Sequence, residues 1–333
     1  MNKKLLIAAV SLIAIALVVA ISDQFINGRD ARLGEPIVKM ANLIGMDSVR
    51  FSQKDKELLL VKDKDSTWRL GSDSGFPADA SKISRLVDEL TRNEVEMLVS
   101  LAKEPAAEFG LTEPTEVTLR KATADVMRIK LGGQRDRGGQ YISFANDPKV
   151  YLISQSLDGR PEESAWELKR LLNIPANQIK KISFNPARAL NKRGVILSRE
   201  KAEDPIKIEK SAQNANEASN IRSHESILSS LDFKEKTEAG NEEAKKALTK
   251  ASRILVTLFD GREFDIQVGS TSATPKKYFM LIKAKKGENT ASSDTQEVEW
   301  INTIMGQYAF EVSTSMAERF EKGLSDMTDK KGS

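Results

Sequence analysis

Short segments in which apolar and polar residues alternate dominate the middle of the chain. Alternation with a period of two is typical of strands that bury one face against a core. The clearest pair of such segments has its apolar positions at Val117 and Leu119, then at Met127, Ile129 and Leu131. This pair predicts an antiparallel hairpin, and residues 141–144 and 150–153 predict two further strands.

The same pattern recurs later in the chain at a constant offset of 137 residues, which carries Gly132 to Gly269. Further matches under this offset are Val117 with Ile254, Leu119 with Val256, Tyr141 with Tyr278 and Phe144 with Leu281. A register that preserves apolar parity, a glycine and a tyrosine indicates a tandem duplication. Asp260 and Gly261 supply a tight-turn dipeptide for the second hairpin.

The layout upstream of each hairpin also matches. The predicted strands are residues 49–51, 58–61 and 68–70 in the first copy and 182–184, 195–197 and 206–208 in the second. A predicted helix follows each set, with Asp79 as the N-cap in the first copy and Ser223 in the second. The apolar faces of these helices are Ile83, Leu86, Val87 and Leu90, and Ile227, Leu228 and Leu231. Further helices are predicted at residues 166–172 and from residue 300 onward.

The N-terminal residues predict export from the cytoplasm. Lys3 and Lys4 precede an uninterrupted apolar run, residues 5–21. A helix over this run spans roughly 26 Å, close to the bilayer hydrocarbon thickness of about 30 Å. We expect an uncleaved anchor at residues 1–22, with a cleaved signal peptide as the alternative. The lysines place the N-terminus in the cytoplasm, so the expected localisation is the inner membrane, single-pass, with the bulk of the chain extracytoplasmic or periplasmic.

These patterns together define the expected fold class as α+β. An N-terminal transmembrane helix is followed by two tandem repeats of an antiparallel sheet with packed helices. The expected boundaries are residues 1–22 for the anchor, 45–175 and 178–325 for the two repeats, and 326–333 for a disordered tail.

Composition argues against several kinds of chemistry. The chain has 51 Lys and Arg against 48 Asp and Glu, interleaved along its length, so no basic block favours nucleic acid. Cysteine is absent, which removes disulfides and thiolate metal sites. His224 is the only histidine, and a single imidazole cannot build the usual metal site or Ser-His-Asp triad. We therefore expect no enzyme and no cofactor, although carboxylates that only the fold brings together leave an enzyme open.

A glycine-rich cluster at residues 132–139 is the main candidate for partner contact. It lacks the G-K-[ST] ending of a phosphate-binding loop and lies between two strands, so it predicts a hairpin loop. Arg135, Asp136 and Arg137 would project from this loop into solvent and form a partner-contact surface. The three tryptophans, Trp68, Trp166 and Trp300, lie in apolar segments and are expected to pack in the core.

Several of these residues resemble one bacterial family, the domain of unknown function 4340. The resemblance rests on Trp68 and Leu70, then Pro77-Ala78-Asp79, then residues 86–90, then Phe109-Gly110-Leu111 with Pro114, and the strand that ends at Leu131-Gly132. It is closer in the first copy, since Ala247-Leu248 and Ala251 replace the glycine motif and proline in the second. The resemblance implies a membrane-anchored protein associated with ABC transporters of the gliding-motility type.

Two functions follow as expectations. The first is a non-enzymatic extracytoplasmic accessory subunit of a membrane complex, whose partners are an ABC-transporter permease or other extracytoplasmic subunits. The alternative is a module that binds an envelope lipid or glycan in the cleft between the two repeats.

Overall fold

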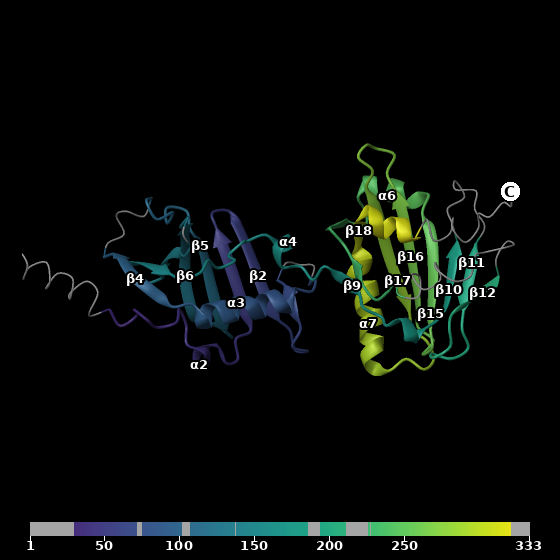
Figure 1. Ribbon diagram of the computed structural model, residues 1–333, viewed down its shortest axis with the longest axis horizontal. Coiled ribbons are helices and arrows are strands. Elements are labelled where there is room, and N and C mark those ends of the chain that lie inside the picture. The colour runs from purple at the N-terminus through teal and green to yellow at the C-terminus, as the bar shows by residue number, and fades with distance from the viewer. Residues whose placement is uncertain are drawn as a thin grey trace, which may run out of the picture. The chain divides into compact units, whose positions relative to one another are not determined.

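The computed structural model divides the chain into two compact units, residues 1–167 and 168–333 (Figure 1). It describes residues 30–71, 75–101, 107–136, 138–185, 194–210, 226 and 228–320. The predicted anchor at residues 1–22, the predicted tail at 326–333 and His224 lie outside the described residues.

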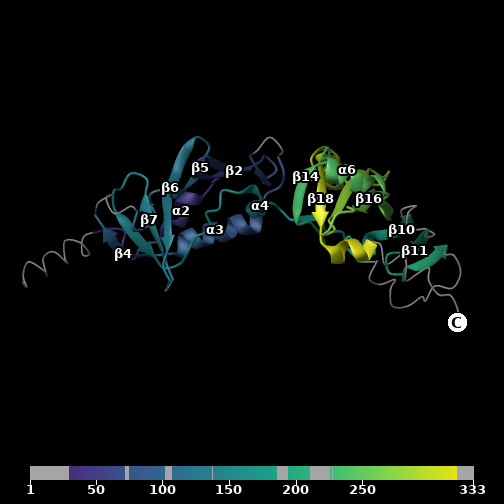
Figure 2. The same cartoon turned by 90° about the horizontal axis from the view of Figure 1, so that it is seen from above.

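The first unit is built on an eight-stranded antiparallel sheet with the order β3-β2-β1-β5-β6-β7-β8-β4. The strands are β1 (Ser48–Gln53), β2 (Lys56–Lys62), β3 (Trp68–Leu70), β4 (Val95–Ser100), β5 (Thr115–Lys121), β6 (Ala124–Gln134), β7 (Gln140–Phe144) and β8 (Val150–Ile153). The helices are α2 (Met40–Leu43), α3 (Ala80–Arg92) and α4 (Glu163–Trp166). Helix α3 lies along one face of the sheet (Figure 2) and buries its apolar stripe there.

The second unit has a sheet of the same design, with the order β12-β11-β10-β15-β16-β17-β18-β14. Its strands are β10 (Ile179–Asn185), β11 (Val195–Ser198), β12 (Lys207–Lys210), β14 (Glu235–Glu238), β15 (Ser252–Leu258), β16 (Glu263–Ser270), β17 (Tyr278–Lys285) and β18 (Tyr308–Val312). A two-stranded sheet joins β9 (Arg170–Leu172) to β13 (Leu231–Asp232). The other elements are α6 (Glu242–Thr249), α7 (Ser292–Thr303) and the 3-10 turns η1 (Ala176–Gln178) and η3 (Met305–Gln307).

The duplication is visible in the strand pairing as well as in the strand order. Leu119 on β5 lies opposite Val49 on β1, and its repeat partner Val256 on β15 lies opposite Ile182 on β10. All four side chains are fully buried. The central strands of both units therefore present equivalent residues to equivalent cores, as the constant offset predicted.

The constant offset fails at the third strand of each meander. Leu131 on β6 lies opposite Ile142 on β7, whereas its repeat partner Val268 on β16 lies opposite Met280 on β17. These two strands therefore match at an offset of 138 residues. Because successive side chains of a strand point to opposite faces, the slip puts the two tyrosines aligned by sequence on opposite faces of their sheets. The predicted matches of residue 141 with 278 and of 144 with 281 are wrong by one position.

The repeated glycine has the same structural reason in both units. A Cβ on Gly132 would lie 2.4 Å from the carbonyl oxygen of Phe109, and one on Gly269 would lie 2.1 Å from that of Ala247. Both contacts are to backbone, which cannot move aside as a flexible side chain can. Only a residue without Cβ permits this approach between the second hairpin strand and the segment before the hairpin.

Replacing Gly269 by alanine is expected to lower the free energy of unfolding by about 1–3 kcal/mol, the usual cost of forcing extra atoms into packed structure. Urea-induced unfolding followed by circular dichroism measures the loss. Gly240→Ala is the matched control, since a Cβ there meets nothing within 4 Å, and its stability should be unchanged or slightly raised. Equal urea midpoints for Gly269→Ala and Gly240→Ala would refute the explanation that a Cβ at position 269 clashes with backbone.

The predicted α+β class is wrong, because the described structure is mostly β, with two large antiparallel sheets. The helix predicted at residues 166–172 is reduced to the single turn α4, and Leu171 and Leu172 lie in strand β9. Leu231, assigned to a second helix, pairs with Leu172 in the small sheet. Apolar spacing over a few residues fits a buried strand as well as a helix, and strand pairing decided between them.

The helix predicted after Asp79 is confirmed. The side chain of Asp79 caps α3 by accepting hydrogen bonds from the backbone N–H groups of Ser81 and Lys82. The helix predicted from residue 300 onward is misplaced, because α7 ends at Thr303 and Trp300 lies in its last turn. Residues 234–250 contain strand β14 and helix α6. Helix α6 packs through two buried alanines and is not merely solvated.

No helix in the part of the chain that the structure describes is long and apolar enough to cross a lipid bilayer. This finding goes against the expected N-terminal transmembrane helix and the single-pass inner-membrane localisation, which are not retained. The segment on which both expectations rested, residues 1–22, is itself outside the described residues.

Candidate functional site

The most distinctive feature of the first unit is a segment that runs beside the end of its sheet, residues 30–38, which we call the strap. Leu33 forms a parallel bridge with Val95, the first residue of β4. The N–H of Gly34 donates to the carbonyl of Val95 at 2.9 Å, and the N–H of Val95 donates to the carbonyl of Glu35 at 3.0 Å. The strap therefore extends the sheet at the beginning of its last strand.

A buried polar cluster fixes the beginning of the strap. The Asp30 side chain is only 5% exposed. It accepts hydrogen bonds from Lys149 Nζ at 2.7 Å, the Tyr151 hydroxyl at 3.0 Å and the backbone N–H of Arg32 at 3.0 Å. The same hydroxyl lies 2.9 Å from a carboxylate oxygen of Asp147. Two carboxylates therefore converge on one phenol beneath the strap.

Burial and hydrogen bonding act in opposite directions on the Asp30 carboxyl. Burial raises its pKa, but the hydrogen bonds from Lys149, the Arg32 backbone and Tyr151 outweigh burial, so the pKa is lowered. The pKa of Tyr151 is raised, first by burial and then by its two carboxylate partners, which keeps the phenol protonated as a donor. The cluster is a structural latch that favours an ionised Asp30 at neutral pH.

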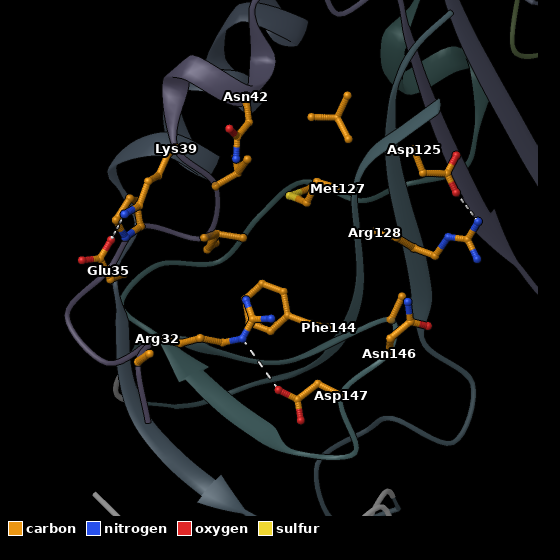
Figure 3. Close-up of a pocket in the computed structure, with 16 residues that line it drawn as sticks. Arg32, Glu35, Lys39, Asn42, Asp125, Met127, Arg128, Phe144, Asn146 and Asp147 are labelled. Atoms are coloured by element: carbon orange, nitrogen blue, oxygen red, sulfur yellow. Dashed lines mark hydrogen bonds and ion pairs between the residues drawn. The ribbon is translucent and has the colours of Figure 1, made fainter. Parts of the chain in front are cut away.

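The strap forms one wall of an open cavity of about 870 Å³ (Figure 3). Helix α2, the start of β6 and the turn after β7 supply the remaining walls. The lining residues are Ala31, Arg32, Glu35, Pro36, Ile37, Val38, Lys39, Asn42, Asp125, Val126, Met127, Arg128, Phe144, Ala145, Asn146 and Asp147. Figure 3 shows the charged side chains around Met127 and Phe144.

The charges that line this cavity neutralise one another in pairs. The Arg32 guanidinium lies 3.8 Å from the centroid of the Phe144 ring and 3.7 Å from an oxygen of Asp147. Lys39 pairs with Glu35 at 2.8 Å, and Arg128 pairs with Asp125, as the dashed lines in Figure 3 show. Among the described lining residues, Arg32, Lys39 and Arg128 are therefore balanced by an equal number of carboxylates.

The lining side chains include no hydroxyl, thiol or imidazole group. These residues therefore offer no serine, threonine or cysteine nucleophile. Across the residues that the structure describes, no three His, Cys, Asp or Glu side chains are grouped to hold a metal ion.

The outer edge of the same sheet end carries exposed apolar side chains. Strand β4 is the last strand of the sheet, at one end of the first unit in Figure 1. Met97 is 52% exposed and Leu101, just after the strand, is 54% exposed. Pairing with β8 is irregular between Val95 and Met97, so that Glu96 and Met97 are both exposed. This edge combines apolar and acidic groups.

The corresponding edge strand of the second unit is different. Strand β14 occupies the same position in its sheet, and its sequence is Glu-Lys-Thr-Glu. Charged residues along an edge strand discourage another strand from pairing with it. Two units with one strand order therefore differ in how they protect the same edge.

The predicted contact loop is in a different place. Arg135 and Asp136 are exposed in the turn between β6 and β7, where the N–H of Arg135 donates to the carbonyl of Gly139 at 3.1 Å. Arg137 lies outside the described residues. The turn follows the end of β6, whereas the cavity lies at the start of that strand, so the fold does not bring the two together.

The latch and the β4 edge were both missed by sequence reasoning. Tyr151 and Asp30 are 121 residues apart, and no local pattern links them. Val95 and Leu98 are buried three residues apart, so this segment lacks the period of two that identifies a strand. It carries no information on which strand would lie beside it.

The fold and this site define a class: duplicated antiparallel β-sheet proteins in which one unit has an exposed apolar edge. The sequence model of one family, Domain of unknown function (DUF4340), matches residues 68–285. The chain belongs to this family, as the resemblance indicated. No curated protein and no solved structure matches the chain.

The latch predicts how the strap responds to pH. Because the pKa of Asp30 is lowered in the folded protein, its contribution to stability is complete above the unfolded value of about 3.9. The contribution is lost as pH falls through the lower folded value. Hydrogen exchange at the amides of Gly34 and Val95 should therefore be constant from pH 7 to 5, after correction for intrinsic rates, and should accelerate below about pH 4.

Asp30→Asn is expected to accelerate the same exchange at neutral pH, corresponding to a loss of about 1–2 kcal/mol from the charged hydrogen bonds. Asp158→Asn is the control, because Asp158 pairs with the exposed Arg160 away from the strap. Strap amides that exchange equally slowly in both variants would show that Asp30 does not hold the strap.

Proposed function

We propose that this protein is a non-enzymatic accessory subunit that binds another protein through the exposed edge of its first unit. The setting implied by the family resemblance is an assembly that contains an ABC transporter of the gliding-motility type. The partner is then the permease or another subunit of that assembly.

One observation carries the proposal: β4 leaves Met97 and Leu101 exposed, whereas the matching strand β14 is charged. Exposed apolar groups on an edge strand invite pairing with another chain. Such an edge favours aggregation unless a partner covers it, so a duplicated protein that protects one copy and not the other is consistent with a binding role.

The test is co-purification with the transporter permease in mild detergent. The double variant Met97→Glu/Leu101→Glu should reduce recovery of the permease at least tenfold. Met40→Glu/Ile44→Glu is the matched control, because these residues on and beside α2 are exposed to a similar degree, 56% and 69%. Recovery unaffected by the β4 variant, or lost only in the α2 variant, would reject the proposal.

A further inference from the structure

We propose that the partner adds an extended, basic segment to the outer edge of β4. Its apolar side chains cover Met97 and Leu101, its Lys or Arg side chains face Glu96, and its first residue lies near Glu94. This inference rests on the proposed function and specifies the chemistry of the partner.

The position of the added strand follows from the strap. Pro36 bridges Glu94, and the hydrogen bonds of Gly34 and Glu35 use the backbone of Val95. From Glu96 onward no strand that the structure describes pairs with the outer side of β4. The strap therefore occupies the beginning of the edge, and a partner strand starts where the strap ends.

The charge of the partner follows from the acidic residues along this edge. Glu94 and Glu96 are both exposed, and neither forms an ion pair with a residue that the structure describes. The nearby strap cations are already engaged, Arg32 with Asp147 and Lys39 with Glu35. Among the described residues the edge is thus acidic without a paired cation, and opposite charges across neighbouring strands stabilise pairing.

A second copy of this chain fits the same edge poorly. Strand β4 contains no Lys or Arg, so two β4 strands placed side by side would supply acidic residues without cations. Like charges on adjacent strands are destabilising. Charge complementarity therefore favours a foreign basic segment over self-association.

The probes for a binding test are three fluorescent peptides of eight residues with one alternating valine framework and Lys, Gln or Glu at the polar positions. We expect the lysine peptide to bind the full chain at least tenfold more tightly than the glutamate peptide in low salt. Methylation of alternate backbone amides, which removes donors needed for strand pairing, should weaken the lysine peptide at least tenfold. Fluorescence anisotropy measures both effects.

Paired variants test the residues. Glu94→Gln/Glu96→Gln should remove most of the preference for lysine, while Glu235→Gln/Glu238→Gln on β14 should leave it unchanged. Met97→Glu/Leu101→Glu should abolish binding of the glutamine peptide. Circular dichroism of each variant establishes that its fold is retained.

The outcomes separate this inference from the proposed function. If the permease is still captured through Met97 and Leu101 but the peptides show no preference for lysine, the basic partner is refuted and the proposed function stands. Equal binding of the methylated peptide refutes strand addition. If the full chain forms a dimer and the Met97→Glu/Leu101→Glu variant is a monomer, the inference of a foreign partner is refuted. Loss of permease capture only in the α2 variant removes both proposals.

Discussion

Replacing Trp166 by alanine is expected to lower the free energy of unfolding of the first unit by about 3–5 kcal/mol. The indole is 1% exposed and stacks on Phe51 with ring centroids 4.7 Å apart. Its Nε1–H donates to the carbonyl of Arg160 at 2.8 Å. The substitution would remove a large apolar surface and leave this carbonyl without the donor it now has.

Hydrogen exchange read by mass spectrometry localises this loss. Protection should fall in β1 and β5 and remain unchanged in β15 and β16, because the two units have separate cores. Trp68→Ala is the control, since Trp68 lies half-buried on edge strand β3 and should cost less. A loss below about 1 kcal/mol for Trp166→Ala would contradict the assigned core role.

The second large effect is expected at Arg262, in the β15–β16 hairpin. Its side chain is 6% exposed. The guanidinium contacts carboxylate oxygens of Asp260 at 2.7 Å and Asp294 at 3.4 Å, and also pairs with Glu297 of α7. Arg262→Leu should lower the free energy of unfolding by about 3 kcal/mol, because it leaves three converging carboxylates without their cation.

The loss should depend on pH in a direction that identifies its cause. Burial raises the pKa of Glu297, although Arg262 opposes this shift. Without the arginine the opposition disappears, and a carboxyl whose folded pKa is raised costs stability once pH rises through that value. The Arg262→Leu variant should therefore regain stability relative to wild type as the pH is lowered from 7 to 5, measured as the midpoint of urea unfolding.

Arg253→Leu is the matched control for this prediction. Arg253 pairs with Asp265 on the neighbouring strand, but its side chain is 59% exposed. An exposed pair of this kind contributes about 0–1 kcal/mol. Equal losses for the two arginine variants, or a loss at Arg262 that does not change with pH, would contradict the account of a buried charge.

Local chemistry made part of the fold predictable. The helix after Asp79 was identified because its cap and its apolar stripe are contained within a few residues. The hairpin strands were identified because apolar and polar residues alternate along each of them in the sequence. The segment from Trp166 to Leu172 was assigned wrongly, because a single helical turn followed by a buried strand has the same apolar spacing as a short helix.

The site was harder to predict than the fold, since its residues meet only through distant pairing. The loop at Arg135 was favoured because charged side chains beside glycines indicate exposure. An edge strand such as β4 is defined by what does not lie beside it, and this depends on the whole sheet order. The contrast with β14 becomes visible only when the two sheets are compared strand by strand.

The one-residue slip between β7 and β17 determines how parts of the two units can be interchanged. In a chimaera that exchanges the third strand at the matching tyrosines, the apolar face of the exchanged strand would point to solvent. Splicing at Ile142 and Met280 instead keeps every inward residue inward. The two units have therefore diverged since the duplication, so that their third strands cannot be exchanged at the aligned tyrosines, Tyr141 and Tyr278.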